Sequence, residues 1–168
     1  GDRGEAMRQA PEGAQQVDLA GATVLPGLAD SHAHLSSVGW RELNFDLIGV
    51  ESVAALQARL RDRAAKDRRD WIVGIGWIES KWSPAVFPTR QDLDAVVTER
   101  PVVLERADGH AIVVNSKALE LAGIDRKTAD PEGGQILRDP ATGEATGMLI
   151  DGAMDLVNRL VPHRRIRN

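Results

Sequence analysis

Hydrophobic and polar residues alternate with two different periods along the chain, which predicts strands and helices in turn. Residues 71–77 are apolar or glycine, and this run predicts a buried strand. Residues 52–67 place apolar side chains at helical spacing behind Ser52, a residue type that often caps helix N-termini. They predict an amphipathic helix with an Arg-rich outer face. Such alternation is typical of an α/β or α+β fold.

Turn and cap residues add short elements before residue 100. Residues 17–27 predict two short strands around an Ala20-Gly21 turn, and residues 28–35 predict a further strand. Thr89 and Asp92 lie three residues apart, which predicts a capping box at the start of a short helix.

The region after residue 100 repeats this pattern. Residues 101–124 predict a strand, an Asp-Gly turn, a second strand and a helix that begins at Ser116 and ends at Gly123. Residues 133–151 predict a hairpin, and residues 152–160 predict a last helix.

Two tryptophans lie six residues apart on the expected strand at residues 71–77. Strand alternation places Trp71 and Trp77 on one face. An aromatic lining of a substrate site and a hydrophobic core both fit this placement, and a core is the commoner outcome.

Composition excludes several classes of protein. The 168 residues are 42% hydrophobic, which suits one globular core. A net charge of -4 with interspersed basic residues argues against nucleic acid as a partner. The absence of cysteine excludes disulfides and thiolate metal sites, and no apolar run reaches the roughly 20 residues that span a membrane. We expect a cytoplasmic protein. Because the sequence starts at Gly1 rather than methionine, we also expect a truncated N-terminus.

Candidate chemistry concentrates in residues 30–34, Asp-Ser-His-Ala-His. On a strand, His32 and His34 project to one face with Cα atoms about 6.6 Å apart, and two such imidazoles suit a zinc ion. An isolated pair of this kind is more often solvated or hydrogen-bonded, so both interpretations stay open. Asp30 lies on the same face, where it either orients a histidine or packs at the strand start.

Two further residues are candidates for the substrate side of a site. His110 follows the Asp108-Gly109 turn and could face a cleft, could cap the turn as a structural residue or, least favoured, could be a third metal ligand. Asp151 ends an expected strand, where both an active-site group and a helix N-cap fit. Asp108 and Asn115 suit turn and cap roles better than catalytic ones.

In this order, these motifs resemble the amidohydrolase superfamily of metal-dependent hydrolases, in the branch (amidohydrolase family 3) that includes N-substituted formamide deformylase. The resemblance covers residues 15–160. The matching segments are residues 17–27, 28–35, 74–82, 88–96, 100–124 and 132–149.

The resemblance implies a (β/α)8 barrel with a small β-sandwich and a large α/β insertion. The implied parts are a partial sandwich segment (1–26), the first barrel strand with the histidine pair (27–39), the insertion (40–146), and a second barrel strand with a helix and basic tail (147–168). A complete barrel takes about 250 residues. We therefore expect an N-terminal fragment that holds only the first barrel strands.

The resemblance also implies a chemistry. His32 and His34 become the first two ligands of a divalent metal, with zinc expected, in a site of one or two ions. Metal-activated water would hydrolyse a C–N bond, other than a peptide bond, in a small-molecule amide or N-formyl substrate. The family's later ligands and its acid-base aspartate have no counterpart here, so the catalytic residues are unknown. The alternative is a non-catalytic truncated remnant or α/β interaction module, which self-associates through surfaces left bare by the missing barrel.

Overall fold

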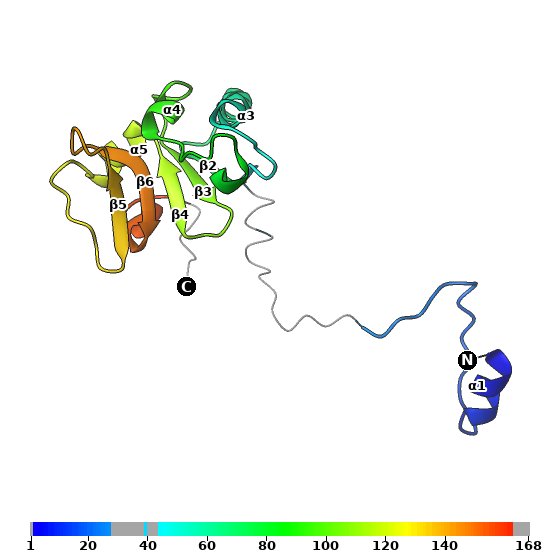
Figure 1. Cartoon of the computed structure of the whole chain (residues 1–168). Helices are drawn as coiled ribbons and strands as arrows, with labels where there is room; N and C mark the ends of the chain where they lie inside the picture. Colours follow the sequence, from blue (N-terminus) through cyan, green and yellow to red (C-terminus); the bar gives the residue numbers. More distant parts are fainter. Residues whose placement is uncertain (1, 28–38, 40–43, 163–168) are drawn as a thin grey trace. The chain divides into compact units, whose positions relative to one another are not determined.

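The computed structural model describes residues 2–27, 39 and 44–162 (Figure 1). The chain divides into two units, Gly1–Ala33 and His34–Asn168. No helix in the described part of the chain is long and apolar enough to cross a membrane.

The first unit contains one helix and two turns among its described residues. Helix α1 (Arg3–Gln9) is capped by Asp2, whose carboxylate accepts a hydrogen bond from the Glu5 amide at 2.8 Å. The predicted Ala20-Gly21 turn is confirmed. The two strands predicted around it are wrong, because residues 17–27 have no strand pairing and a strand needs a partner for its backbone groups.

The second unit is built on a six-stranded mixed sheet in the order β1-β2-β3-β4-β6-β5. The first three strands in this order are parallel, and the remaining pairs are antiparallel. The sheet confirms the α/β class and the strands predicted after residue 70. The strands are β1 (Phe45–Asp46), β2 (Ile72–Trp77), β3 (Val102–Arg106), β4 (Ala111–Val114), β5 (Gly134–Arg138) and β6 (Ala145–Asp151).

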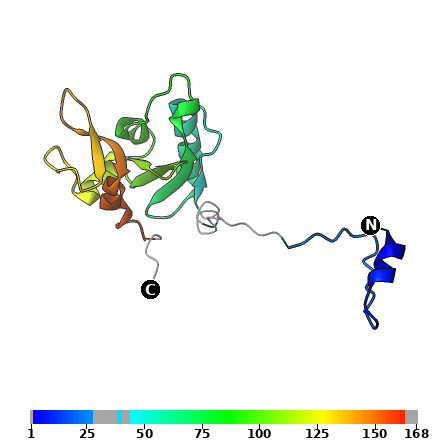
Figure 2. The same ribbon diagram turned by 60° about the horizontal axis from the view of Figure 1, so that its bottom comes forward.

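Helices cover both faces of this sheet, and each face has its own hydrophobic cluster. Leu60 of α3 and Leu93 of α4 pack in one cluster, whereas Leu119 of α5 and Val157 of α6 pack in the other. Figure 2 shows α4 and the orange-red η2–α6 segment on opposite sides of the strands. The helices are α3 (Val53–Lys66), η1 (Glu79–Lys81), α4 (Arg90–Asp94), α5 (Ser116–Ala122), η2 (Gly152–Met154) and α6 (Asp155–Asn158).

The predicted helix ends are confirmed at the level of single hydrogen bonds. The Ser52 hydroxyl accepts from the Ala55 amide at the start of α3. Thr89 and Asp92 form the predicted capping box of α4. Asn115 caps α5, as expected, and is fully buried.

A β-bulge separates the two tryptophans that were expected on one face. Ile75 pairs with Glu105 and Trp77 with Arg106, so Gly76 is an extra residue in β2. Its φ of 111° suits glycine. Trp77 is consequently buried in the cluster beneath α3, while Trp71 packs against the cluster on the opposite face. The shared-face prediction is wrong, and the core role of Trp77 is confirmed.

Strand β6 belongs to the same sheet as the elements before it. It pairs antiparallel with β4 on one side and β5 on the other. Residues expected in the insertion and in the second barrel strand therefore share one sheet. The assignment of residues 147–151 to a barrel strand stays a prediction.

Candidate functional site

The predicted metal ligands are not part of the site that the structure describes. His32, His34 and Asp30 lie outside the described residues. Within the described ranges, no group of three or more His, Cys, Asp or Glu side chains could hold a metal ion. The other two predicted residues, His110 and Asp151, define the candidate site.

The topology of the sheet gathers several strand ends at one edge, which we call the carboxyl edge. β6 is antiparallel to β4, which is antiparallel to β3, so β1, β2, β3 and β6 all end there. His110 immediately precedes β4 and Asp151 ends β6, so both lie at the carboxyl edge. The Asp151 amide donates to the His110 carbonyl at 3.0 Å. Ligands of open α/β sheets bind at this kind of edge.

The side chains of His110 and Asp151 form a pair. His110 Nδ1 lies 2.9 Å from Asp151 Oδ1, and the two side chains are 75% and 52% exposed. The hydrogen bond to the Asp151 carboxylate, and then the negative charges of Asp151 and Asp108, raise the pKa of His110 above its ordinary value. The ring contacts Asp151, whereas the backbone amide of His110 donates to Asp108 at 3.1 Å. The expected turn-capping role of the ring is therefore wrong.

The backbone of Asp151 is unusual for a residue with a side chain. Its φ of 47° and ψ of -121° lie in a region that favours glycine. Its carboxylate makes no capping hydrogen bond to η2. The N-cap interpretation of Asp151 is therefore wrong, and the side chain contacts His110 instead.

Close backbone packing holds this corner in place. A Cβ atom on Gly134 would lie 2.1 Å from the Ala153 nitrogen, so β5 and η2 approach each other at a distance that only glycine permits. The Gly152 amide also donates to the Gly133 carbonyl at 3.1 Å. The conformation of Asp151 is thus fixed from both sides.

Sequence reasoning missed an ion pair beside His110. The Arg106 guanidinium makes two hydrogen bonds of 2.8 Å to the Glu79 carboxylate and also contacts Asp108. This pairing raises the pKa of Arg106 and lowers that of Glu79. Glu79 and Arg106 are 27 residues apart, and no spacing rule links them. The His110 cluster consists of Glu79, Arg106, Asp108, His110 and Asp151, with three carboxylates against one guanidinium.

A groove lies at the same edge of the sheet. Segments that follow β1, β2 and β3 line it, so it adjoins the strand ends that carry the His110 cluster. Its lining is mostly apolar but contains one acid and one base. The apolar side chains are Ile48, Val50, Ile78 and Ala107, the acid is Glu51 and the base is Lys81.

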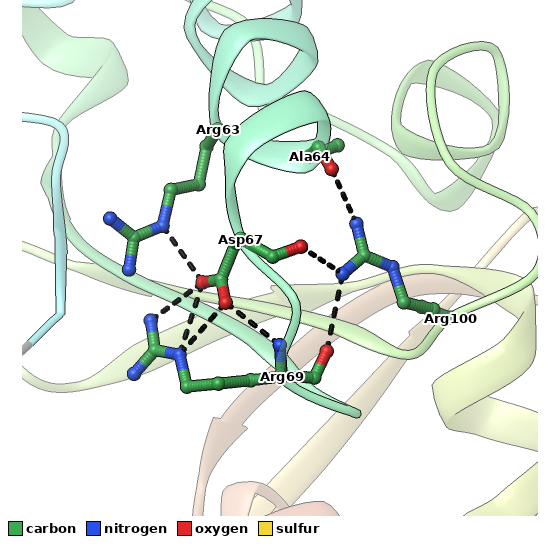
Figure 3. A network of polar contacts seen from close by, with 5 residues as sticks. All are labelled: Arg63, Ala64, Asp67, Arg69 and Arg100. Atoms are coloured by element: carbon green, nitrogen blue, oxygen red, sulfur yellow. Dashed lines mark hydrogen bonds and ion pairs between the residues drawn. The ribbon is translucent and has the colours of Figure 1, made fainter.

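A second charged group, the Asp67 network, is centred on the segment between the end of α3 and the start of β2 (Figure 3). It consists of Arg63, Asp67, Arg69 and Arg100. The Asp67 carboxylate is 5% exposed and accepts from Arg63 at 2.9 Å and Arg69 at 2.7 Å. Arg69, more than any other group, holds the pKa of Asp67 well below its ordinary value.

The same network also satisfies the end of α3. The Arg100 guanidinium donates to the carbonyls of Ala64 and Asp67 at 2.7 Å and to that of Arg69 at 3.2 Å. The Ala64 carbonyl lies in the last turn of α3, where carbonyls have no intrahelical partner, and the carbonyls of Asp67 and Arg69 follow the helix. The network therefore has the features of a structural cluster.

Comparison with known proteins supports the resemblance seen in the sequence. The amidohydrolase family matches residues 15–167. Over 88% of its length the chain is 42% identical to YtcJ of Bacillus subtilis, of which it covers 28%. It is 34% identical to an N-substituted formamide deformylase of Arthrobacter pascens, over 94% of this chain and 30% of that protein.

A solved structure agrees with these sequence matches. It is an uncharacterized metal-dependent hydrolase from Pyrococcus horikoshii, with 27% identity and a TM-score of 0.56 over 80% of this chain and 24% of that one. The chain thus spans less than a third of the length of these relatives. The match across residues 15–167 is nonetheless decisive, and the chain belongs to the amidohydrolase family.

Proposed function

We propose that this chain contributes to a metal-dependent hydrolase that uses water to cleave a C–N bond in a small-molecule amide or N-formyl compound. One observation carries the proposal: the family match over residues 15–167 includes the His32-Ala33-His34 pair. The similarity to a deformylase of N-substituted formamides and to a metal-dependent hydrolase supports the substrate class and the metal.

The proposal places the metal on His32 and His34. Imidazole nitrogens are among the preferred ligands of zinc, so the donor chemistry of this pair fits. Catalytic zinc takes about three protein ligands and a water, so the proposal requires at least one ligand besides this pair. A metal bound there would lower the pKa of its water. The His110 cluster would act at the substrate side.

The proposal also includes an architecture. Residues 1–26 would belong to a small β-sandwich and residues 27–39 to the first strand of a (β/α)8 barrel. Residues 40–146 would form an inserted α/β region, followed by a second barrel strand, a helix and a basic tail over 147–168. Two hydrophobic clusters on opposite faces of one sheet support an α/β region that packs largely on itself. The same observation favours an α/β interaction module as the second candidate function.

Zinc content tests the proposed site directly. The full chain and a His32→Ala/His34→Ala variant would be equilibrated with zinc, desalted and analysed by mass spectrometry for bound metal. His163→Gln is the matched control, because it removes a histidine of the basic tail to which no ligand role is given. We expect the double variant to lose bound zinc and the control to retain it. Equal zinc in all three proteins would overturn the metal site.

Hydrolysis is the second measurement. Release of amine from a panel of N-formyl amines and simple amides would be followed for the same three proteins. Turnover that disappears with His32 and His34 supports the hydrolase. Zinc binding without turnover of any compound favours the interaction module.

A further inference from the structure

We propose that Asp151 is a positioning residue for His110, so that the ring Nε2–H of His110 donates a hydrogen bond to the carbonyl oxygen of an amide ligand at the carboxyl edge. The proposal rests on the proposed function only for the choice of an amide. The pair itself does not depend on that function: the pairing of β4 with β6 brings His110 and Asp151 together, although they are 41 positions apart in the sequence.

The geometry leaves one ring atom for a ligand. Asp151 Oδ1 lies 2.9 Å from His110 Nδ1, which fixes the orientation of the ring. Nε2 is on the far side of the imidazole, and the described residues give it no hydrogen-bond partner. The side chain is 75% exposed, so a small molecule can reach this nitrogen.

The backbone of Asp151 is the second observation. Glycine occupies the two positions near Asp151 where an added Cβ would clash with another backbone segment, namely Gly134 and Gly152. An aspartate at φ 47° is disfavoured, yet its carboxylate makes no cap and contacts the His110 ring instead. Residues in such conformations cluster at functional sites, where strain is part of the positioning.

The charges around His110 select the kind of ligand. Asp151 at the end of β6 and Asp108 in the β3–β4 turn face the ring, and Arg106 on β3 is paired with Glu79 of η1. The two carboxylates raise the pKa of His110 and so favour the imidazolium, in which Nε2 is a donor. They also repel an anionic ligand at close range. A neutral carbonyl oxygen accepts from Nε2–H without this repulsion.

Nuclear magnetic resonance of the full chain with 15N-labelled histidine tests the proposal. N-methylformamide is the amide probe, and sodium formate is the anionic probe. At pH 6 we expect N-methylformamide to shift the His110 Nε2 resonance in a saturable manner. Asp151→Gly should weaken this binding at least fivefold, because the ring loses its anchor while glycine suits the backbone. Asp155→Asn, which changes an exposed acid that starts α6, should leave binding unchanged.

Each outcome decides the proposal. No saturable shift in the unmodified chain, or equal binding in Asp151→Gly, would overturn it. A formate response as strong as that of N-methylformamide would overturn the choice of a neutral ligand. Asp151→Asn gives a second check, since it keeps a side-chain acceptor without the charge and should bind between the other two. Zinc content depends on His32 and His34, so a failure here is distinguishable from a failure of the proposed metal site.

Discussion

The Asp67 network and the His110 cluster lie at opposite edges of one sheet, and aspartate carboxylates have different partners in the two. Asp67 follows α3 and precedes the amino end of β2, and its carboxylate is buried and held by two arginines. His110 and Asp151 lie at the carboxyl edge, where both side chains are largely exposed. The Asp67 carboxylate already accepts hydrogen bonds from protein donors, whereas His110 keeps its ring Nε2 accessible.

This difference separates stability from recognition. Carboxylates whose acceptor sites are occupied by protein donors cannot bind a ligand without losing those donors. In barrel enzymes the amino ends of strands serve stability and the carboxyl ends carry chemistry. The same division within this sheet predicts that substitutions at Asp67 affect unfolding and that substitutions at Asp151 affect ligand binding.

The largest effect is expected at Asp67. Asp67→Ala removes the carboxylate that accepts hydrogen bonds from Arg63 and Arg69. Because both arginines are partly solvated, we expect a loss of about 2–3 kcal/mol in the free energy of unfolding. Urea denaturation measures it, with Asp62→Ala on the exposed face of α3 as control. A loss no larger than that of Asp62→Ala would contradict a structural role.

Acid should weaken the same network. The folded-state pKa of Asp67 is lowered, so its ionised form stabilises the protein above the ordinary aspartate pKa of about 3.9. This contribution is lost as pH falls below that value toward the folded pKa, at up to about 1.4 kcal/mol per pH unit. The difference in unfolding free energy between the unmodified chain and Asp67→Asn should therefore shrink between pH 5 and pH 3. A difference independent of pH in this range would show that the charge of Asp67 contributes nothing.

At the carboxyl edge, a substitution should raise the free energy of unfolding rather than lower it. Asp151→Gly removes a side chain from a backbone region that favours glycine, while the exposed pair with His110 contributes little to stability. We expect a gain of about 1 kcal/mol in the free energy of unfolding, measured by urea denaturation. Asp151→Ala is the control, because it removes the same contact without relieving the backbone. If both variants lose stability equally, the carboxylate rather than the backbone dominates at this position.

Local signals in the sequence predicted much of the fold. Ser52, Thr89 and Asn115 were recognisable as cap residues because capping depends on neighbours within three positions. The Gly76 bulge was not predictable, since an extra residue is defined only by the register of β3 beside it. That single bulge reverses the face of Trp77.

The candidate site depended even more on distant pairing. His110 and Asp151 were each candidates for the substrate side, but their contact requires β4 and β6 to be neighbours. The ion pair of Glu79 with Arg106 likewise joins η1 to β3. Periodicity fixes which residues share a face of one element, whereas the order of strands in a sheet is set by tertiary packing. Sequence therefore supplied the residues and not their partners.

The smallest effect on the free energy of unfolding is expected from the charge of His110. It sharpens the contrast with Asp67, because the His110 contribution is lost as pH rises, whereas that of Asp67 is lost as pH falls. The folded-state pKa of His110 is raised, so the pair with Asp151 stabilises the protein fully below the ordinary value of 6.5. The contribution is lost as pH rises through the folded pKa. Urea denaturation at pH 5.5 and 8.5 should show a small excess of stability over His110→Gln at the lower pH that disappears at the higher one. Other histidines titrate in both proteins and cancel in this comparison. In an Asp151→Asn background the excess should shrink, and an excess that persists there would assign the effect to Asp108 rather than Asp151.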